Sequence, residues 1–327
     1  MNLDKKSKIL RRIENEVGVP NLSNILAEKI KPTDLQSLLL AVYQKRASSR
    51  KPRDVFLDYH SNKFMIPSHI DPLLLLEWDH LAFSHLPNGY ESIEISPVAP
   101  FGCVSSVAPI SQDWILTTIR NMEFVSDTTT ILALECALRR QKLLYDKITK
   151  SKEVHLACSH RVVRSQRYES SELYQHFRLF SLCSAGRTTG NLNFELKTVQ
   201  SHVRFYLDTM RSFLGDEITF RVVLSDMSPD SRNYLTLSDL VNRMDENLGG
   251  ENIRFEIVSN KKNEYYQNVR FGIYCARLHE REYGLVDGGV VDWTQKFLNN
   301  SKERFIISGI GSKRVCELRT QNYGNEF

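Results

Sequence analysis

Several strand-like segments of this sequence follow one another through connections too short to hold a crossover helix. Apolar and β-branched residues dominate each segment, and polar or turn-forming residues bound it. Helical patterns gather between groups of strands and do not alternate with every strand. Parallel neighbours need long crossovers, whereas antiparallel neighbours do not. The order therefore predicts an α+β fold in which helices flank a mainly antiparallel β-sheet. The strand-like segments are residues 154–163, 174–185, 218–226, 253–259 and 269–278.

Helical periodicity separates the N-terminal part of the chain from the rest. Pro32 is a typical first residue of a helix, with apolar side chains recurring on one face after it. The polar, proline-containing segment 47–54 predicts a boundary. We therefore expect a small helical N-terminal domain at 1–53 and one larger core at 54–327. The helical segments are residues 3–16, 22–46, 72–86, the stretch that follows Thr129, 195–214 and 236–247.

Positive charge is concentrated in this N-terminal region. Residues 1–53 hold twelve Lys and Arg against five Asp and Glu, although the whole chain has a formal net charge of only +4. Such a surface suits an acceptor RNA or a protein partner. It is equally typical of a solvated helical surface, and both interpretations stay open.

Other features narrow the class of protein. No run of about 18 apolar residues occurs, so no membrane span is predicted. The N-terminus is charged and lacks the apolar centre of a secretory signal. Six scattered cysteines without a CxxC pair predict free thiols and a cytoplasmic protein. Strand alternation places His155 on the opposite face from Cys158 and His160, so no protein metal site is predicted.

The segment RFIISGIGSKRVCEL, residues 304–318, carries a possible anion site. A short apolar strand at 305–307 leads to Gly309 and Gly311, which predict a tight turn before a helix. Free backbone N–H groups at a helix N-terminus suit a phosphate, and the cationic side chain of Arg314 follows at once. The alternative is an ordinary strand, turn and helix.

A second candidate is the predicted hairpin between residues 161 and 180. Its first strand ends in Arg161 and Arg164, and its second strand carries Phe177 and Phe180. An arginine suits a phosphate and an aromatic ring suits a nucleobase. The alternative is an ordinary charged hairpin.

In this order the segments resemble the catalytic core of class II aminoacyl-tRNA synthetases, over roughly residues 75–320. The resemblance is strongest to histidyl-tRNA synthetase and to the regulatory subunit of ATP phosphoribosyltransferase. The helix and strand up to Pro97 look like motif 1, which implies a homodimer formed around that proline. The hairpin looks like motif 2 and the segment ISGIGSKRV looks like motif 3.

The resemblance implies an ATP site and an amino-acid site. Arg164 would hold the α-phosphate, Phe177 would stack on adenine, and Arg314 would reach the far phosphate of a Mg²⁺-bound ATP. Gly309 and Gly311 would let the backbone approach the nucleotide. Catalysis would rest on Arg164, Arg314 and Lys261. The implied amino-acid contacts are Asp127, Thr129, Gln166, Tyr265, Gly288, Gly289 and Asp292.

The chain departs from the family at several of these positions. Gln166 replaces the acid of motif 2, and Lys261 replaces an arginine. Leu179 and Cys183 stand where the histidine branch has a Gln and a Glu that read the imidazole, so histidine is not the expected substrate. The sequence ends shortly after motif 3, which predicts that no anticodon-binding domain of that branch follows.

Two functions are consistent with this sequence. The first is a stand-alone enzyme that activates a small amino or carboxylic acid with ATP, as an adenylate, for transfer to a non-canonical acceptor. The second is a catalytically degenerate paralogue that senses a ligand and supports a partner enzyme. The retained arginines and Phe177 favour the first, and the substituted positions favour the second.

Overall fold

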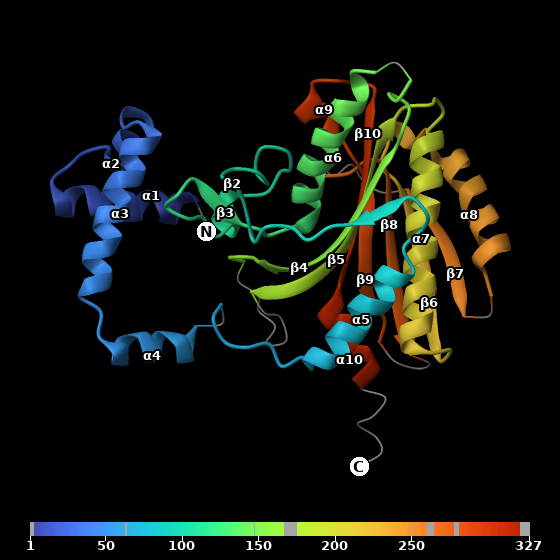
Figure 1. Cartoon of the computed structure of the whole chain (residues 1–327), viewed down its shortest axis with the longest axis horizontal. Coiled ribbons are helices and arrows are strands. Elements are labelled where there is room, and N and C mark those ends of the chain that lie inside the picture. Colours follow the sequence, from blue (N-terminus) through green and yellow to red (C-terminus); the bar gives the residue numbers. More distant parts are fainter. Residues whose placement is uncertain are drawn as a thin grey trace, which may run out of the picture.

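The computed structural model describes residues 3–62, 64–146, 148–166, 175–250, 252–259, 265–277 and 281–320. Within these residues, eight strands form one mixed sheet (Figure 1). The β1–β4 and β6–β7 pairs are parallel, and the five pairs between them are antiparallel. The predicted α+β class and mainly antiparallel sheet are confirmed. In spatial order the strands are β1 (Tyr90–Ser92), β4 (Val154–Val163), β5 (His176–Arg187), β10 (Glu303–Gly311), β9 (Tyr283–Val291), β8 (Gln267–Arg277), β6 (Ile218–Asp226) and β7 (Ile253–Ser259).

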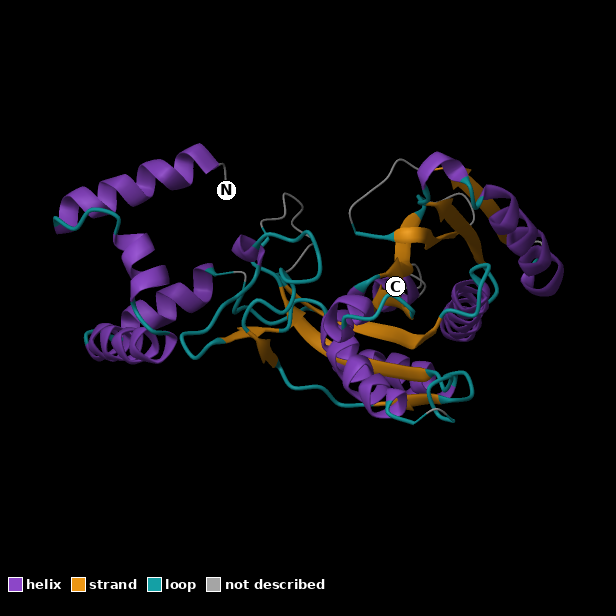
Figure 2. Cartoon of the chain, turned by 90° about the horizontal axis from the view of Figure 1, so that it is seen from above, coloured by secondary structure: helices purple, strands orange, loops and turns teal. Residues whose placement is uncertain are grey.

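Two helical layers cover the two faces of this sheet (Figures 1 and 2). Strand β10 sends Ile306 to the core beneath the first layer and Ile307 to the core beneath the second, because side chains alternate along a strand. The first layer holds α5 (Pro72–Ser84), α7 (Asn193–Leu214), α8 (Tyr234–Leu248) and α10 (Ser312–Thr320). The second layer holds α6 (Thr128–Leu144) and α9 (Trp293–Leu298).

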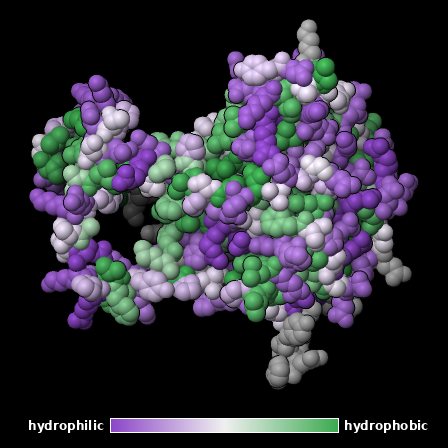
Figure 3. All heavy atoms as spheres, in the orientation of Figure 1, coloured by the Kyte–Doolittle hydropathy of each residue, from purple (hydrophilic) through white to green (hydrophobic). Residues whose placement is uncertain are grey.

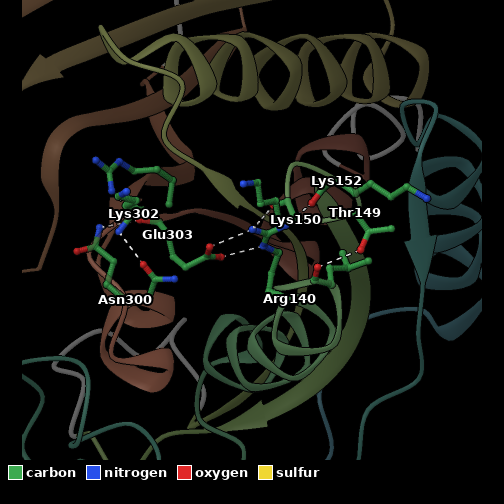
Figure 4. A network of polar contacts seen from close by, with 10 residues as sticks. Arg140, Thr149, Lys150, Lys152, Asn300, Lys302 and Glu303 are labelled. Atoms are coloured by element: carbon green, nitrogen blue, oxygen red, sulfur yellow. Dashed lines mark hydrogen bonds and ion pairs between the residues drawn. The ribbon is translucent and has the colours of Figure 1, made fainter. Parts of the chain in front are cut away.

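A buried ion pair fastens α6 to Glu303, the first residue of β10 (Figure 4). Nε of Arg140 donates to Oε2 of Glu303 at 2.8 Å and Nη2 donates to Oε1 at 2.9 Å. The guanidinium also donates to the carbonyl oxygens of Lys150 and Lys152. Neither charged side chain is exposed. The pair fixes α6 against the sheet, and the opposite end of α6 begins at Asp127, in the candidate site.

The N-terminal helices form an arm beside this body, which we call the N-terminal arm (Figures 1 and 3). Nζ of Lys6 contacts Oδ1 of Asp113 in the body at 2.7 Å. The helix predicted at 22–46 is interrupted, because Ile30 and Lys31 are extended before Pro32. A further helix spans the predicted boundary at residue 53, and the two-domain division stays a prediction. The arm contains α1 (Leu3–Val17), α2 (Leu22–Asn24), the π-helical turn η1 (Ile25–Lys29), α3 (Pro32–Ser48) and α4 (Pro52–Ser61).

The body also contains a small, separate two-stranded sheet. It pairs β2 (Val98–Pro100) with β3 (Met122–Phe124), and the 3₁₀ turn η2 (Gln112–Trp114) lies between them in sequence. The carbonyl of Pro97 accepts a hydrogen bond from the Val125 amide at 3.1 Å, which leads the chain from this sheet toward α6. None of the described helices is long and apolar enough to cross a membrane.

Candidate functional site

The α6-facing side of the central strands carries the candidate site, which we call the site face. Gly309 of β10 lies opposite Ser181 of β5 on one side and Asp287 of β9 on the other. The hydroxyl of Thr128, at the start of α6, contacts the Ser181 hydroxyl at 2.5 Å. A Cβ on Gly309 would lie 3.2 Å from the Ser181 hydroxyl oxygen, so glycine lets these two strands hold their polar side chains close together.

Arg164 is fixed at the edge of the site face by three contacts. Its Nε donates to the Ser126 carbonyl at 2.8 Å, and Nη2 lies 3.4 Å from Oδ2 of Asp127. Its guanidinium carbon lies 5.1 Å from the ring centroid of Phe177. Arg164 and Phe177, which the sequence predicted to lie together, are therefore adjacent, and Asp127 contacts the arginine.

Asp127 is the N-cap of α6, a role for which aspartate before a helix is well suited. Its Oδ1 accepts from the backbone N–H of Thr129 at 2.9 Å and from the Thr129 hydroxyl at 2.7 Å. Among the described residues, its Oδ2 contacts only Arg164, at the longer distance of 3.4 Å. The predicted site residues Asp127 and Thr129 are thus in contact, and the Thr129 hydroxyl donates its hydrogen to the Asp127 carboxylate.

Tyr265 is a buried residue whose pKa responds to Asp127 and to a second charged group of the site. Burial raises the pKa of Tyr265 well above its ordinary value. The carboxylates of Asp127 and Asp287 raise this pKa further, and Arg164 lowers it. Tyr265 therefore lies within electrostatic reach of all three charges. Its ring packs edge-on against Trp293, with centroids 5.8 Å apart.

An ion pair between neighbouring strands forms this second charged group. Nε and Nη2 of Arg270 in β8 contact Oδ1 of Asp287 in β9 at 2.9 and 2.8 Å. The Tyr266 hydroxyl donates to Oδ2 of Asp287 at 2.6 Å. Burial and the adjacent Asp287 carboxylate raise the pKa of Tyr266 well above its ordinary value, so this hydroxyl stays a donor.

Arg270, Asp287 and Tyr266 were not predicted as site residues from the sequence. The available signal was the charge of Arg270 between the apolar residues Val269 and Phe271 of a strand-like segment.

The predicted glycine turn is wrong. β10 continues through Gly309 to Gly311, which pairs with Leu179, and α10 begins at the next residue. A side chain at Gly311 would meet open space. Arg314 is exposed on the first turn of α10, and its Nη1 donates to the Gly284 carbonyl at 3.3 Å. The two glycines therefore lie within the sheet, and Arg314 follows the C-terminal end of β10, a central strand.

The other glycines predicted for the amino-acid site are packed against protein atoms. A Cβ on Gly288 would lie 2.6 Å from the Phe271 ring, and a Cβ on Gly289 would lie 2.7 Å from the Tyr266 ring. Close packing of the sheet accounts for both glycines. Asp292 pairs with Lys296 of α9, with Oδ1 and Nζ 2.9 Å apart.

Four further positions singled out in the sequence are Gln166, Leu179, Cys183 and Lys261. Gln166 is half-buried just after Arg164. Lys261 lies outside the described residues. Cys183 is fully buried, and burial raises its thiol pKa well above the ordinary value. Leu179 and Cys183 thus line an apolar part of the site face.

Metal coordination is not built into the described part of the site. The described residues contain no group of three His, Cys, Asp or Glu side chains that could hold a metal ion. Both site carboxylates are engaged, Asp127 by Arg164 and Asp287 by Arg270. These residues do not fit a dedicated Mg²⁺ site.

Comparison with known proteins gives matches at the level of structure. No protein-family model and no curated protein matches the sequence. A Bacillus halodurans ATP phosphoribosyltransferase regulatory subunit/histidyl-tRNA synthetase superimposes with a TM-score of 0.58 at 14% identity, covering 79% of this chain and 84% of that one. Staphylococcus aureus histidyl-tRNA synthetase gives 0.55 at 11% identity, covering 79% and 74%.

A third structure is similar over almost its whole length. The histidine–tRNA ligase subunit of Alicyclobacillus acidocaldarius gives a TM-score of 0.55 at 11% identity, covering 84% of this chain and 98% of that one. At such identities the likeness shows the fold. The predicted class II synthetase-like fold, of the kind seen in the histidine-type proteins, is confirmed.

Proposed function

We propose that this protein binds ATP and a small amino acid, or another carboxylic acid, on the site face and joins them as an acyl-adenylate. The anchored Arg164 beside Phe177 carries the proposal. Its guanidinium is held by Ser126 and Asp127 and lies over the ring. A fixed guanidinium fits a phosphate, and the exposed part of an adjacent aromatic ring fits a nucleobase.

The proposed reaction is an in-line displacement at the α-phosphorus. A carboxylate oxygen of the acid forms a bond to phosphorus, and the bond between phosphorus and the pyrophosphate oxygen breaks. Arg164 stabilises the negative charge that builds on the α-phosphate oxygens, because it is oriented before the reaction. Arg314 takes the far phosphate at the end of β10. Mg²⁺ would come with the nucleotide, and no step here depends on a protein ligand for it.

Asp127 receives the ammonium group of an amino-acid substrate. Its Oδ1 accepts from Thr129 at 2.7 and 2.9 Å, while Oδ2 lies 3.4 Å from Arg164, its single partner in the described part of the chain. Oδ2 has the longer contact, and the ammonium group would take this oxygen in competition with Arg164.

A second candidate function is a regulatory subunit that senses a ligand and supports a partner enzyme. The contact between Arg164 and Asp127 favours it, since each group meets the other in place of a substrate. The B. halodurans structure is itself described as a regulatory subunit/histidyl-tRNA synthetase. Under either function, we propose a homodimer formed around Pro97 and an RNA or protein partner for the basic N-terminal arm.

Calorimetric titration with MgATP tests the ATP site. Arg164→Ala should weaken binding by about tenfold or more, since a charged hydrogen bond to phosphate is lost. Arg221→Ala is the matched control, because Arg221 is also paired with carboxylates and lies 4.4 Å from the Tyr274 ring centroid, on β6. Equal binding by both variants and the unaltered protein would refute the assignment of Arg164.

A further inference from the structure

Arg270 is a charged residue placed in the middle of an apolar strand. Its neighbours Val269 and Phe271 are fully buried on the opposite side of the sheet, whereas the Arg270 side chain is 31% exposed on the site face. Nε and Nη2 are both used by Oδ1 of Asp287. Nη1 has no partner among the described residues. The guanidinium is thus held in place with one N–H edge free.

Asp287 and Tyr266 hold Arg270 in place without using its Nη1 group. Asp287 receives Arg270 on Oδ1 and the Tyr266 hydroxyl on Oδ2, so both carboxylate oxygens are engaged. Asp287 also lies between two glycines of neighbouring strands, Gly272 and Gly309. The side chains of Arg270 and Asp287 are 31% and 50% exposed. A ligand on the site face can therefore reach the guanidinium.

Arg270 and the proposed acid site belong to one surface. Tyr265 and Tyr266 are consecutive, with ring centroids 4.8 Å apart. Thr128, next to Asp127, contacts Ser181, and Gly309 lies between Ser181 and Asp287 in the sheet. One acid held by its ammonium at Asp127 can thus extend along the tyrosines toward Arg270.

We propose that Arg270 binds a second carboxylate, and that the substrate is a dicarboxylic amino acid. The inference rests on the proposed acid-binding function of the same face. A guanidinium edge matches a carboxylate with two parallel N–H···O bonds. The pair of Arg270 and Asp287 is neutral overall, which suits a single negative charge better than a phosphate dianion beside Asp287.

Calorimetry on the full chain, with a saturating non-hydrolysable ATP analogue, tests this assignment. The probes are L-aspartate and L-glutamate, each with its amide, L-asparagine or L-glutamine, and O-phosphoserine. At least one dicarboxylic acid should bind about tenfold or more tightly than its amide, because a charge-assisted bidentate contact is lost in the amide. Arg270→Gln should abolish the difference, and Arg270→Lys should reduce it. Arg221→Gln should leave it unchanged.

Each result separates this inference from the proposed function. If the ATP analogue binds but each amide binds as well as its acid, the Arg270 assignment is refuted and the ATP site stands. Tighter binding of O-phosphoserine than of either dicarboxylic acid also refutes the Arg270 assignment. The assignment is refuted as well if none of the five probes binds. Failure of the unaltered protein to bind the ATP analogue sinks the proposed function itself. Thermal unfolding of each Arg270 variant must match the unaltered protein, and Tyr266→Phe provides an independent variant that loosens Asp287 and should weaken the same preference.

Discussion

Arg140→Met is expected to destabilise the protein strongly, because it leaves the Glu303 carboxylate buried without a cation. Both side chains have no exposed area. The substitution removes two charged hydrogen bonds, of 2.8 and 2.9 Å, from that carboxylate. It also frees two carbonyls, on Lys150 and Lys152, whose residues are exposed and which water can reach.

The size of the effect follows from the lost contacts. Two hydrogen bonds to a charged group contribute about 1.5–3 kcal/mol each, so their loss costs about 3–6 kcal/mol. Breaking a buried ion pair by removing one partner typically costs about 3–5 kcal/mol. Methionine fills much of the volume of the arginine, which keeps the cavity contribution small. The two estimates agree, and the loss is a large fraction of a typical stability of about 5–15 kcal/mol.

Urea unfolding followed by circular dichroism measures this loss as a change in the midpoint at constant slope. The matched control is Arg139→Met, one residue earlier on α6, where a half-exposed arginine pairs with Glu91 and Glu135. That control should lose less than about 1 kcal/mol. The double variant Arg140→Met/Glu303→Leu should regain most of the stability, since no buried charge remains. A loss below about 1 kcal/mol for Arg140→Met, or a double variant no better than the single one, would refute the reasoning.

Three further predictions concern pH, backbone packing and thiols. Burial lowers the pKa of His202 to about 3, so the folded protein keeps this imidazole neutral while the unfolded chain binds a proton near pH 6.5. Stability should therefore fall by about 1.4 kcal/mol per pH unit from this group as the pH drops from 6.5 toward 3, and urea titrations of His202→Gln should lack that contribution. Gly288→Ala should lose about 1–3 kcal/mol through contact with Phe271, while Gly311→Ala, which meets open space, should keep its midpoint. All six cysteines are free and buried, so iodoacetamide at pH 8 should label them only after unfolding, and rapid labelling of the native protein would contradict their burial.

Local pattern was sufficient to predict most of the sheet. Strands β4 and β6 begin and end where the sequence predicted. Their side chains are buried on one or both faces of the sheet, and such burial requires a run of apolar residues that is visible in the sequence. β9 was missed, since Gly284, Gly288 and Gly289 weaken its strand pattern. Those glycines are explained only by neighbouring strands and rings.

The candidate site was predicted in part, through the hairpin that carries Arg164 and Phe177. The contact of Arg164 with Asp127 joins residues 37 positions apart and depends on how α6 meets β4. The pair of Arg270 and Asp287 was not predicted, because it requires the register between β8 and β9, which shifts between Gln267 and Arg270. Gly309 and Gly311 indicated a turn locally, but pairing with β5 keeps both in the strand.

ATP–pyrophosphate exchange on the purified protein tests the central claim most directly. The assay would contain Mg²⁺ and each amino acid in turn, with Arg164→Ala and Arg314→Ala beside the unaltered protein. The account predicts exchange that depends on one acid and is lost in Arg164→Ala, with a marked decrease in Arg314→Ala. No exchange with any acid, from a protein that binds ATP, would contradict adenylate formation and favour the ligand-sensing function.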